Sequence, residues 1–437
     1  MEAVTGEGVK VLDKANKAKV LELELTTDFE PFTHQQEALD AWQEAGGRGV
    51  VVLPTGAGKT FVAHLAIQSV NQSALIVVPT LDLMQQWYAG LEKAFPGADL
   101  GLLGGGSKDD AALLVATYDS AAIFAEKLGN RFGLLVFDEV HHLPGDFTRT
   151  VAEYSLAPYR LGLSATVERS DGKHADIFEL VGQAVYRKTP EQLAGGALAE
   201  YRTERIKVRL SDEERRAYDE AVAQRNAFLS ENRIFLGTLQ GWQRFVRASA
   251  QSSAGRAAML AHRRARALAF GTDAKLRVLA DLLTKHAGDR VLIFTDDNRT
   301  VYRVSEVFLI PAITHQTKVK ERHAALTRFR AGEYPRLVTS RVLNEGVDVP
   351  AANVAIVLSG TGSTREHVQR LGRILRPAAG KQAVLYEVVA EDTSEETVSK
   401  RRRGELKSDP KPTEAPAEAS SGLKPISAQE SLSFDEL

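Results

Sequence analysis

The stretch VVVLPTGAGKTFVAHLAIQ, residues 50–68, runs from four apolar residues through a glycine-rich turn into a segment of helical composition. A turn of this kind, between a strand and a helix, points backbone N–H groups and the positive helix end at a bound phosphate. The lysine adds a mobile positive charge, and the threonine hydroxyl can bind Mg²⁺. The generic pattern has a glycine where Leu53 stands, whereas TGAGKT is intact. The stretch predicts a site for nucleotide phosphates, built from Thr55, Gly56, Ala57, Gly58, Lys59 and Thr60.

Apolar runs of strand length recur along the chain, with gaps long enough for crossover helices. ALIVVP, ALLVATY, LLVFDE and RLGLSAT follow the opening stretch, and VLIF, RLVTS, VAIVL and AVLYEVV come after residue 290. Continuous apolar runs are typical of buried parallel strands covered by helices. We therefore expect an α/β fold with two parallel-sheet lobes and a helical segment between them. The expected parts are a short N-terminal extension (1–30), a first lobe (31–205), a helical insertion (206–272), a second lobe (273–400) and a flexible tail (401–437) rich in Pro, Ala, Glu and Ser.

Two acidic residues follow one of the buried runs, in LLVFDEVHH. A buried strand that ends in two carboxylates is costly unless a cation or ligand shares the site. Asp138 is placed to hold Mg²⁺, directly or through water, and Glu139 to activate the water that attacks the γ-phosphate. Together with the phosphate loop, this pair predicts nucleotide hydrolysis.

The second half contains QRLGRILRP, residues 369–377. If this segment is helical, Gln369, Arg373 and Arg376 share one face. Two arginines on one face suit an anion supplied from elsewhere, and an arginine finger stabilises the charge of a transferring phosphoryl group. We therefore expect Arg373 and Arg376 to complete the nucleotide site when the lobes close.

Composition sets wider limits. The chain of 437 residues has 43% hydrophobic and 26% charged residues, a formal net charge of -2 and no cysteine. The lack of cysteine excludes disulfides, thiolate nucleophiles and cysteine-based zinc sites. The N-terminus has no apolar signal core, and no run approaches the ~20 apolar residues of a membrane span. We expect a cytoplasmic protein, associated with the nucleoid if its host is bacterial, and no membrane partner.

These motifs resemble, in order and spacing, those of superfamily 2 helicases. TGAGKT, DEVH and SAT match motifs I, II and III, TSRVLNEGVDVP and QRLGRILR match motifs V and VI, and LIVVPTLDLMQQW matches motif Ia, which contacts the nucleic-acid backbone. The resemblance implies two RecA-like lobes that use ATP and Mg²⁺. It also places Gln35, of FTHQQEALDAW, at the adenine, and Gly346, Asp348 and Gln369 at the nucleotide.

Within that superfamily the chain is most similar to the XPB-type DNA repair and transcription helicases. LGLSATVERSDGK resembles their motif III followed by an Arg-Glu-Asp loop, in which Arg169 and Asp171 match and Ser170 replaces the glutamate. The resemblance implies an ATP-dependent DNA helicase or translocase of 3′–5′ polarity that acts in repair. It further implies that His141 couples the acid pair to the motif III turn with Ser164 and Thr166.

The expected helical insertion has a composition of its own. Between residues 221 and 270 there are eight arginines against one acid, Glu231, and Phe228, Phe235, Trp242 and Phe245 are interleaved with them. Basic side chains neutralise phosphates, and aromatic rings either stack on bases or pack a core. We expect the insertion to contact DNA through residues such as Trp242, Arg244 and Arg247, and most of the aromatics to form its core.

Other interpretations remain open at this stage. The motor of a restriction or remodelling system, which moves on duplex DNA without unwinding it, uses similar motifs. An RNA helicase and a DNA-binding scaffold that does not hydrolyse ATP are further alternatives. A repair nuclease is a plausible partner, and the terminal QESLSFDEL spaces Gln429, Leu432 and Phe434 somewhat like peptides that dock on sliding clamps.

Overall fold

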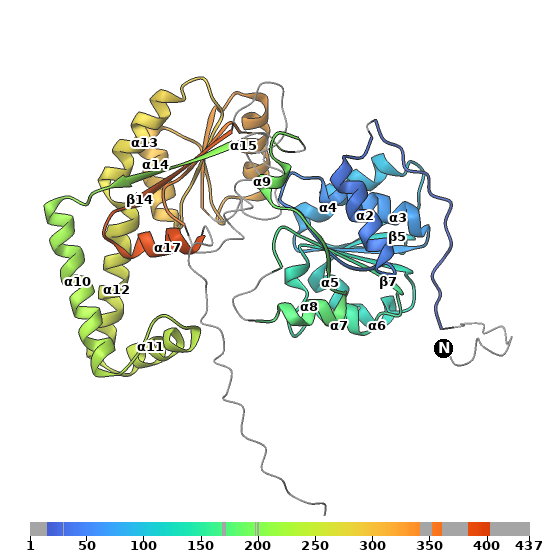
Figure 1. Ribbon diagram of the computed structural model, residues 1–437, viewed down its shortest axis with the longest axis horizontal. Coiled ribbons are helices and arrows are strands. Elements are labelled where there is room, and N and C mark those ends of the chain that lie inside the picture. The colour runs from blue at the N-terminus through green and yellow to red at the C-terminus, as the bar shows by residue number, and fades with distance from the viewer. Residues whose placement is uncertain are drawn as a thin grey trace, which may run out of the picture.

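A computed structural model describes two α/β lobes and three helices that extend from the second lobe (Figure 1). This confirms the predicted α/β class with two parallel-sheet lobes. No helix in the described ranges is long and apolar enough to cross a membrane. The structure describes residues 15–28, 30–167, 172–196, 198, 201–340, 352–360 and 383–402. The predicted tail therefore lies outside the described residues from 403 onward, including the clamp-like peptide.

The first lobe is built on one sheet with the strand order β4-β3-β5-β2-β6-β7-β1-β8. All its pairs are parallel except β3 with β4. The strands are β1 (Arg48–Val52), β2 (Ala74–Val78), β3 (Leu100–Gly104), β4 (Ser107–Lys108), β5 (Leu113–Thr117), β6 (Leu134–Asp138), β7 (Tyr159–Ser164) and β8 (Ala184–Arg187). The helices are α2 (Thr33–Glu44), α3 (Lys59–Val70), α4 (Leu81–Ala94), α5 (Tyr118–Ile123), α6 (Ala125–Leu128), α7 (Thr150–Glu153), α8 (His174–Leu180) and α9 (Pro190–Leu193), with a 3-10 helix at Val140–His142.

Alternate residues of these strands serve two separate cores, which explains the continuous apolar runs. Val51 and Val136 pack with α2, α3 and α4 on one face of the sheet. Val50 and Leu135 pack with α5 to α8 on the other face. Each fully buried aliphatic side chain contributes about 1.5–3 kcal/mol to the hydrophobic free energy of folding. The carboxyl ends of the central strands are therefore held rigidly, and the predicted site residues follow them.

The second lobe has the strand order β11-β12-β10-β13-β14-β9, and every pair is parallel. Its strands are β9 (Tyr201–Val208), β10 (Val291–Phe294), β11 (Ala312–Ile313), β12 (Arg336–Thr339), β13 (Val354–Val357) and β14 (Ala383–Ala390). Its helices are α13 (Asp273–Lys285), α14 (Asn298–Phe308), α15 (Val319–Ala331) and α17 (Ser394–Arg402). The last helix continues two residues past the predicted end of the lobe at 400.

Strand β9 corrects the predicted boundary between the parts. The expected division at residue 205 falls inside this strand, whose whole length pairs with β14, from Tyr201 opposite Ala383 to Val208 opposite Ala390. Because β9 belongs to the second sheet, the helical insertion connects β9 to α13 within the second lobe. It does not join one lobe to the other.

The insertion forms three helices, α10 (Asp212–Glu231), α11 (Leu239–Gln251) and α12 (Ser253–Gly271), here called the thumb. Ser211 begins α10 with a capping box, because its hydroxyl accepts from the Glu214 N–H and the Glu214 carboxylate accepts from the Ser211 N–H. Phe228 and Phe245 are buried in the thumb core. Trp242 and Phe235 are 39% and 75% exposed, so half of the predicted core aromatics face solvent.

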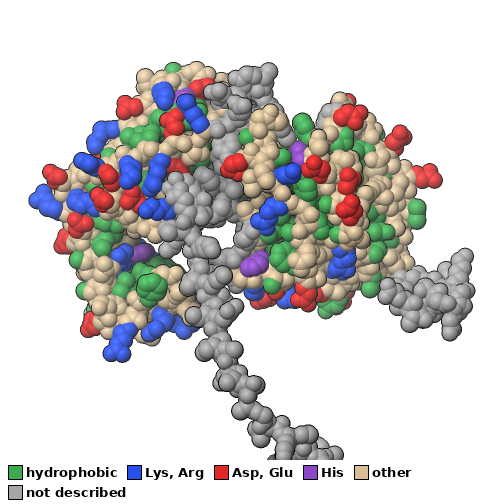
Figure 2. All heavy atoms as spheres, viewed as in Figure 1, with side chains coloured by type: hydrophobic (Ala, Val, Ile, Leu, Met, Phe, Trp, Pro, Cys, Tyr) green, Lys and Arg blue, Asp and Glu red, His purple; other side chains and the backbone are tan. Residues whose placement is uncertain are grey.

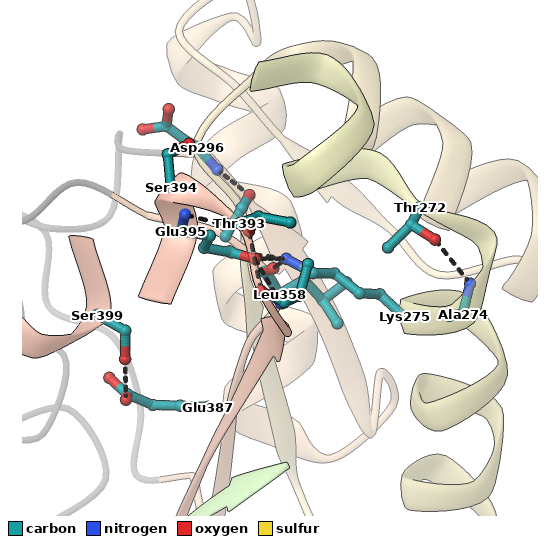
Figure 3. A network of polar contacts seen from close by, with 12 residues as sticks. Thr272, Ala274, Lys275, Asp296, Leu358, Glu387, Thr393, Ser394, Glu395 and Ser399 are labelled. Atoms are coloured by element: carbon teal, nitrogen blue, oxygen red, sulfur yellow. Dashed lines mark hydrogen bonds and ion pairs between the residues drawn. The ribbon is translucent and has the colours of Figure 1, made fainter. Parts of the chain in front are cut away.

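A buried ion pair fastens the second lobe at the base of the thumb (Figure 3). Lys275 of α13 contacts both carboxylate oxygens of Glu395 in α17 at 2.7 and 2.6 Å, and each side chain is 2% exposed. The ammonium also donates to the carbonyl of Leu358, just after β13, over 2.6 Å. The N–H of Ala390 donates to the Glu395 carboxylate over 2.8 Å. One pair of charges thus connects α13, α17 and the ends of β13 and β14.

The described part of the N-terminal extension runs along the first lobe. The N–H groups of Lys17, Leu21 and Thr26 donate to the carbonyls of Asn130, Asn71 and Ala94 at 2.7, 2.8 and 2.8 Å. These bonds attach the extension to loops and helix ends on the side of the lobe away from the phosphate-loop turn.

Candidate nucleotide-binding site

The predicted phosphate loop connects β1 to α3, and its glycines have the backbone conformation that the turn requires. Gly56 and Gly58 have φ of +90° and +79°, a region that residues with a side chain rarely adopt. A Cβ on Gly58 would also overlap the amide of Gln35. Lys59 Nζ donates to the carbonyl of Leu53 over 3.1 Å, so the lysine is folded back over its own loop. Thr60 is exposed at the first turn of α3.

One polar atom of this loop has no partner in the described structure. Thr55 Oγ1 is buried and forms no hydrogen bond with the described residues. A buried hydroxyl without a partner costs about 1–3 kcal/mol. An anion bound in the loop would accept this hydrogen bond, so the residues present fit a phosphate.

The side chain of Gln35 forms hydrogen bonds with the backbone of the phosphate loop. Its Nε2 donates to the carbonyls of Ala57 and Gly58 at 3.3 and 3.4 Å, and its Oε1 accepts from the N–H of Phe32 over 3.0 Å. The neighbouring His34 also contacts the Ala57 carbonyl through Nε2 at 2.8 Å. The structure places Gln35 beside the loop, as the resemblance requires, and its role in reading adenine stays a prediction.

The two acids stand at the end of β6, on the sheet edge that carries the phosphate loop. Asp138 Oδ1 accepts from the N–H of Glu139 over 3.0 Å, and its Oδ2 accepts from the indole N–H of Trp87 over 2.8 Å. The O–H of Tyr118 donates to the Asp138 carbonyl over 3.0 Å. Glu139 has φ of +46°, an uncommon conformation for a residue with a side chain and one that clusters at functional sites.

Burial is the main influence on the protonation of Asp138. It raises the pKa of Asp138 above the ordinary value, while the hydrogen bond from Trp87 and the nearby ammonium of Lys59 act in the opposite direction. Burial, and then the charges of the same two acids, raise the pKa of the Tyr118 phenol, which stays neutral. Both acids are buried, at 7% and 8% exposed, so a cation at this edge would remove an unfavourable concentration of negative charge.

His141 lies between the acids and the end of β7. Its Nδ1 is 3.3 Å from Ser164 Oγ and 3.4 Å from Glu139 Oε2. Ser164 Oγ in turn donates to the carbonyl of Thr166 over 2.6 Å. The histidine therefore contacts both groups that it is predicted to couple, whereas the coupling itself stays a prediction.

Several predicted site residues lie outside the described part of the chain. They are Arg169 and Asp171 of the loop after motif III, Gly346 and Asp348 of motif V, and Gln369, Arg373 and Arg376 of motif VI.

Exposed arginines gather where the thumb joins the second lobe. A cavity of about 540 Å³ opens between the end of α12 and the first turns of α13 and α14. Figure 2 shows Lys and Arg side chains over the second lobe and the thumb. Arg266 and Arg303 pair with Asp296 and Asp273. The arginines that line the cavity are Arg263, Arg264, Arg266, Arg299 and Arg303.

Three of these arginines, Arg263, Arg264 and Arg299, form no ion pair with any acid that the structure describes. Further along the thumb, Trp242, Arg244 and Arg247 are exposed on α11. The cavity is also lined by Glu214, Asp273, Asp296 and Asp297, so the positive charge that remains is that of the three arginines without a described ion-pair partner. Such arginines, together with an exposed aromatic ring, are a combination that suits a nucleic-acid strand.

Two family models match the chain, one in each half. The model "Type III restriction enzyme, res subunit" matches residues 28–169, and "ERCC3/RAD25/XPB C-terminal helicase" matches residues 258–408. A protein of Sulfurisphaera tokodaii named "DNA 3'-5' translocase XPB2" is 43% identical over 370 residues, which cover 85% of this chain and 84% of the relative. The chain belongs to the XPB family. The predicted family is thereby confirmed.

Other XPB proteins are longer than the matched region. The "DNA 3'-5' helicase XPB" of Mycobacterium tuberculosis is 31% identical, and the match covers 82% of this chain and 60% of the relative. A yeast XPB, "General transcription and DNA repair factor IIH helicase/translocase subunit XPB/SSL2", is 24% identical, and the match covers 90% of this chain and 45% of the relative. Among solved structures, the Hef helicase domain of Pyrococcus furiosus has 18% identity, a TM-score of 0.58, and 84% and 97% coverage of the two chains. That likeness supports the helicase fold.

Sequence reasoning missed one contact in the site of this XPB chain. Trp87 bonds directly to the predicted metal-holding carboxylate, yet its position in α4, with Met84 and Leu91 on the same buried face, is typical of an ordinary core residue. Trp87 differs from an ordinary core residue only in being a tryptophan, where an aliphatic side chain would also fill the space. The spacing of apolar residues in α4 does not indicate that the indole bonds to Asp138.

Proposed function

We propose that this chain hydrolyses ATP, with Mg²⁺, to drive movement along DNA or its unwinding in the 3′–5′ direction. The main support is that the phosphate loop and the acid pair share one sheet edge, where the ammonium of Lys59 lies close enough to oppose the burial-driven rise in the pKa of Asp138. The names of the XPB relatives supply the reaction and its polarity.

The residues of the first lobe then have distinct roles. Backbone N–H groups of the loop and the ammonium of Lys59 hold the phosphates, and Thr55 supplies a further hydroxyl. Glu139 accepts a proton from the attacking water. Asp138 and Thr60 would hold Mg²⁺, which neutralises charge that develops on the phosphates. Among the described residues no group of three or more His, Asp or Glu side chains forms a complete metal cage. The two oxygen donors, Asp138 and Thr60, suit Mg²⁺, which keeps waters and substrate oxygens as most of its ligands.

The second lobe would complete the site. We propose that Arg373 and Arg376, together with Gly346, Asp348 and Gln369, contact the nucleotide when the lobes close, and that hydrolysis reopens them. A cycle of this kind moves the protein only if its DNA contacts hold the strand differently in the two states. The thumb and the arginine-lined cavity are the proposed contacts in the second lobe, and the loop before α4 is the proposed contact in the first.

A role in DNA repair is proposed from the names of the relatives. A repair nuclease and a sliding clamp remain proposed partners, on the sequence resemblance and the terminal peptide alone. We further propose that the protein acts in the cytoplasm, at the nucleoid if its host is bacterial.

One set of measurements tests the proposal. ATP turnover of the full chain is measured alone and with single-stranded DNA, duplex DNA or RNA, and strand displacement with 3′-tailed and 5′-tailed duplexes. We expect stimulation by DNA and displacement of the 3′-tailed substrate. Strongest stimulation by RNA would indicate an RNA helicase, and stimulation by duplex DNA without displacement would indicate a pure duplex translocase. No turnover under any condition would indicate a scaffold.

A further inference from the structure

Trp87 connects a helix of the first lobe to the acid pair. Its indole N–H donates to Asp138 Oδ2 over 2.8 Å, and the two side chains are 2% and 7% exposed. Helix α4, which carries Trp87, follows β2, and β2 is the direct neighbour of β6 in the sheet. The second turn of α4 therefore lies above the end of β6, where Asp138 stands.

The packing around Trp87 holds its ring in one orientation. The ring of His64, from α3, meets it edge-on with 5.9 Å between centroids, and the rings of Phe95 and His64 also meet edge-on, at 6.0 Å. His64 belongs to the helix that begins with Lys59 of the phosphate loop. A site is most accurate when packing fixes the side chains that orient its polar groups. The indole is thus fixed against the two elements that form the nucleotide site.

The acceptor distinguishes this tryptophan from another buried one. Trp42 is equally buried, at 1% exposed, and donates to the backbone carbonyl of Arg160 over 3.0 Å. A neutral backbone carbonyl is a sufficient hydrogen-bond acceptor for a buried indole N–H. Trp87 instead bonds to a carboxylate, and hydrogen bonds to an ionised acceptor in a buried site are about twice as strong as neutral ones.

Two donors fix the Asp138 carboxylate. The Glu139 N–H bonds to Oδ1 and the Trp87 N–H to Oδ2, so neither oxygen is free to rotate. Each oxygen retains a second lone-pair direction for a cation. The plane of the carboxylate, and hence the direction in which it presents those lone pairs, is set by the indole of Trp87 and the backbone of Glu139.

We propose that Trp87 is a positioning residue that holds the Asp138 carboxylate in the orientation required to bind a divalent cation. The inference rests on the proposed function, in which Asp138 holds Mg²⁺. Loss of an outer hydrogen bond to a metal ligand reduces metal affinity by about 10- to 100-fold. The sequence places no other indole within the first lobe's site, because the remaining tryptophans are Trp42 and Trp242.

The test compares W87F with W42F. Both substitutions remove an indole N–H and keep an aromatic ring, but only W87F removes the bond to Asp138. We expect the Mg²⁺ concentration for half-maximal ATP turnover to rise about tenfold or more in W87F and to stay within twofold of the wild type in W42F. Binding of Mn²⁺ with a non-hydrolysable ATP analogue, followed by electron paramagnetic resonance, is expected to weaken by the same factor without any turnover.

Unchanged Mn²⁺ affinity in folded W87F would overturn the proposal. If W87F does not fold, the variant W42F/W242F keeps Trp87 as the sole tryptophan. Its emission is then expected to change when Mn²⁺ and the analogue bind, and the further substitution D138N to abolish that change. No change in emission on Mn²⁺ binding would also overturn the proposal. Failure of the proposed function is distinguishable, because the wild type would then show no divalent-dependent turnover at all.

Discussion

Arg322 of α15, in the second lobe, donates to the carboxylate of Asp82, in the first turn of α4, over 3.3 Å. The two side chains are 17% and 35% exposed. Arg322 also donates to the carbonyl of Thr317 over 3.4 Å, which orients it toward the first lobe. Helix α4 therefore contacts the opposite lobe at its first turn and Asp138 at its second.

We expect this ion pair to stabilise the described arrangement of the lobes by about 0.5–1 kcal/mol, because it is partly exposed. The chain has no cysteine, so one cysteine can be placed in each lobe for dye labelling. D82N and R322Q are each expected to broaden the distance distribution between the lobes, measured by single-molecule energy transfer. The exchange D82R/R322D restores the narrow distribution if the pair acts through its charges, and a distribution as broad as that of the single variants would contradict this.

Glu139 is expected to be the residue whose loss separates ATP binding from hydrolysis. E139Q keeps the size of the side chain and removes the base, so turnover falls by about 10²-fold or more while nucleotide affinity stays within a few-fold. Turnover is measured by phosphate release and affinity by a fluorescent ATP analogue. K59A is the comparison, since loss of its charge reduces affinity as well. Unchanged turnover in E139Q would assign the proton transfer to another group.

His64 is expected to make the first lobe sensitive to acid. Burial lowers the pKa of His64 to about 4 in the folded chain, against about 6.5 when unfolded. The unfolded chain therefore binds more protons between these values, so the stability is complete above pH 6.5 and falls as the pH approaches 4. The resulting loss of unfolding free energy reaches about 3 kcal/mol once the pH falls below the pKa of the folded state.

H64L removes the titrating group and keeps an apolar side chain of similar reach. Denaturant unfolding of the wild type and H64L is compared at pH 7.5 and pH 5. We expect the wild type to lose more stability than H64L on acidification. Equal losses would assign the acid sensitivity to other groups.

The Lys275–Glu395 pair is expected to be sensitive to loss of either charge. K275M leaves Glu395 charged and buried without its partner, which destabilises the fold by about 3–5 kcal/mol. The double variant K275M/E395L removes both charges and is expected to recover much of that loss. Chemical denaturation gives both values. A K275M variant as stable as the wild type would show that Glu395 takes up a proton or another partner at little cost.

The arginine-lined cavity is expected to neutralise DNA phosphates. Replacing Arg263, Arg264 and Arg299 with alanine should weaken DNA binding for all sequences alike and reduce the slope of log affinity against log salt by about 0.9 per lost phosphate contact. Fluorescence anisotropy over a range of salt measures this. R328A is the matched control, since Arg328 is exposed on α15 and pairs with Glu333. An unchanged slope in the triple variant would place the DNA elsewhere.

The nucleotide site was predictable because its chemistry is local in the sequence. The phosphate loop and Asp138 each follow a continuous apolar run, and parallel strands bring their carboxyl ends to one edge. Strand β9 was not predictable in this way. Its sequence, YRTERIKV, has charged residues at four of eight positions and no continuous apolar run, since it lies at an edge and pairs on one side only, with β14. Trp87 shows the other limit, because a tertiary hydrogen bond leaves no periodicity in the sequence.

The position of β9 has a mechanical consequence. Both ends of the thumb are rooted in the second sheet, α10 directly after β9 and α12 directly before α13. The thumb must therefore move together with that sheet as one rigid unit. Helix α10 has 20 residues and so extends about 30 Å. A rotation of about 10° about its first turn would move the far end of α10 by about 5 Å. This exceeds the spacing of about 3.4 Å per nucleotide along one strand of B-DNA, so a small hinge rotation is enough to span one nucleotide.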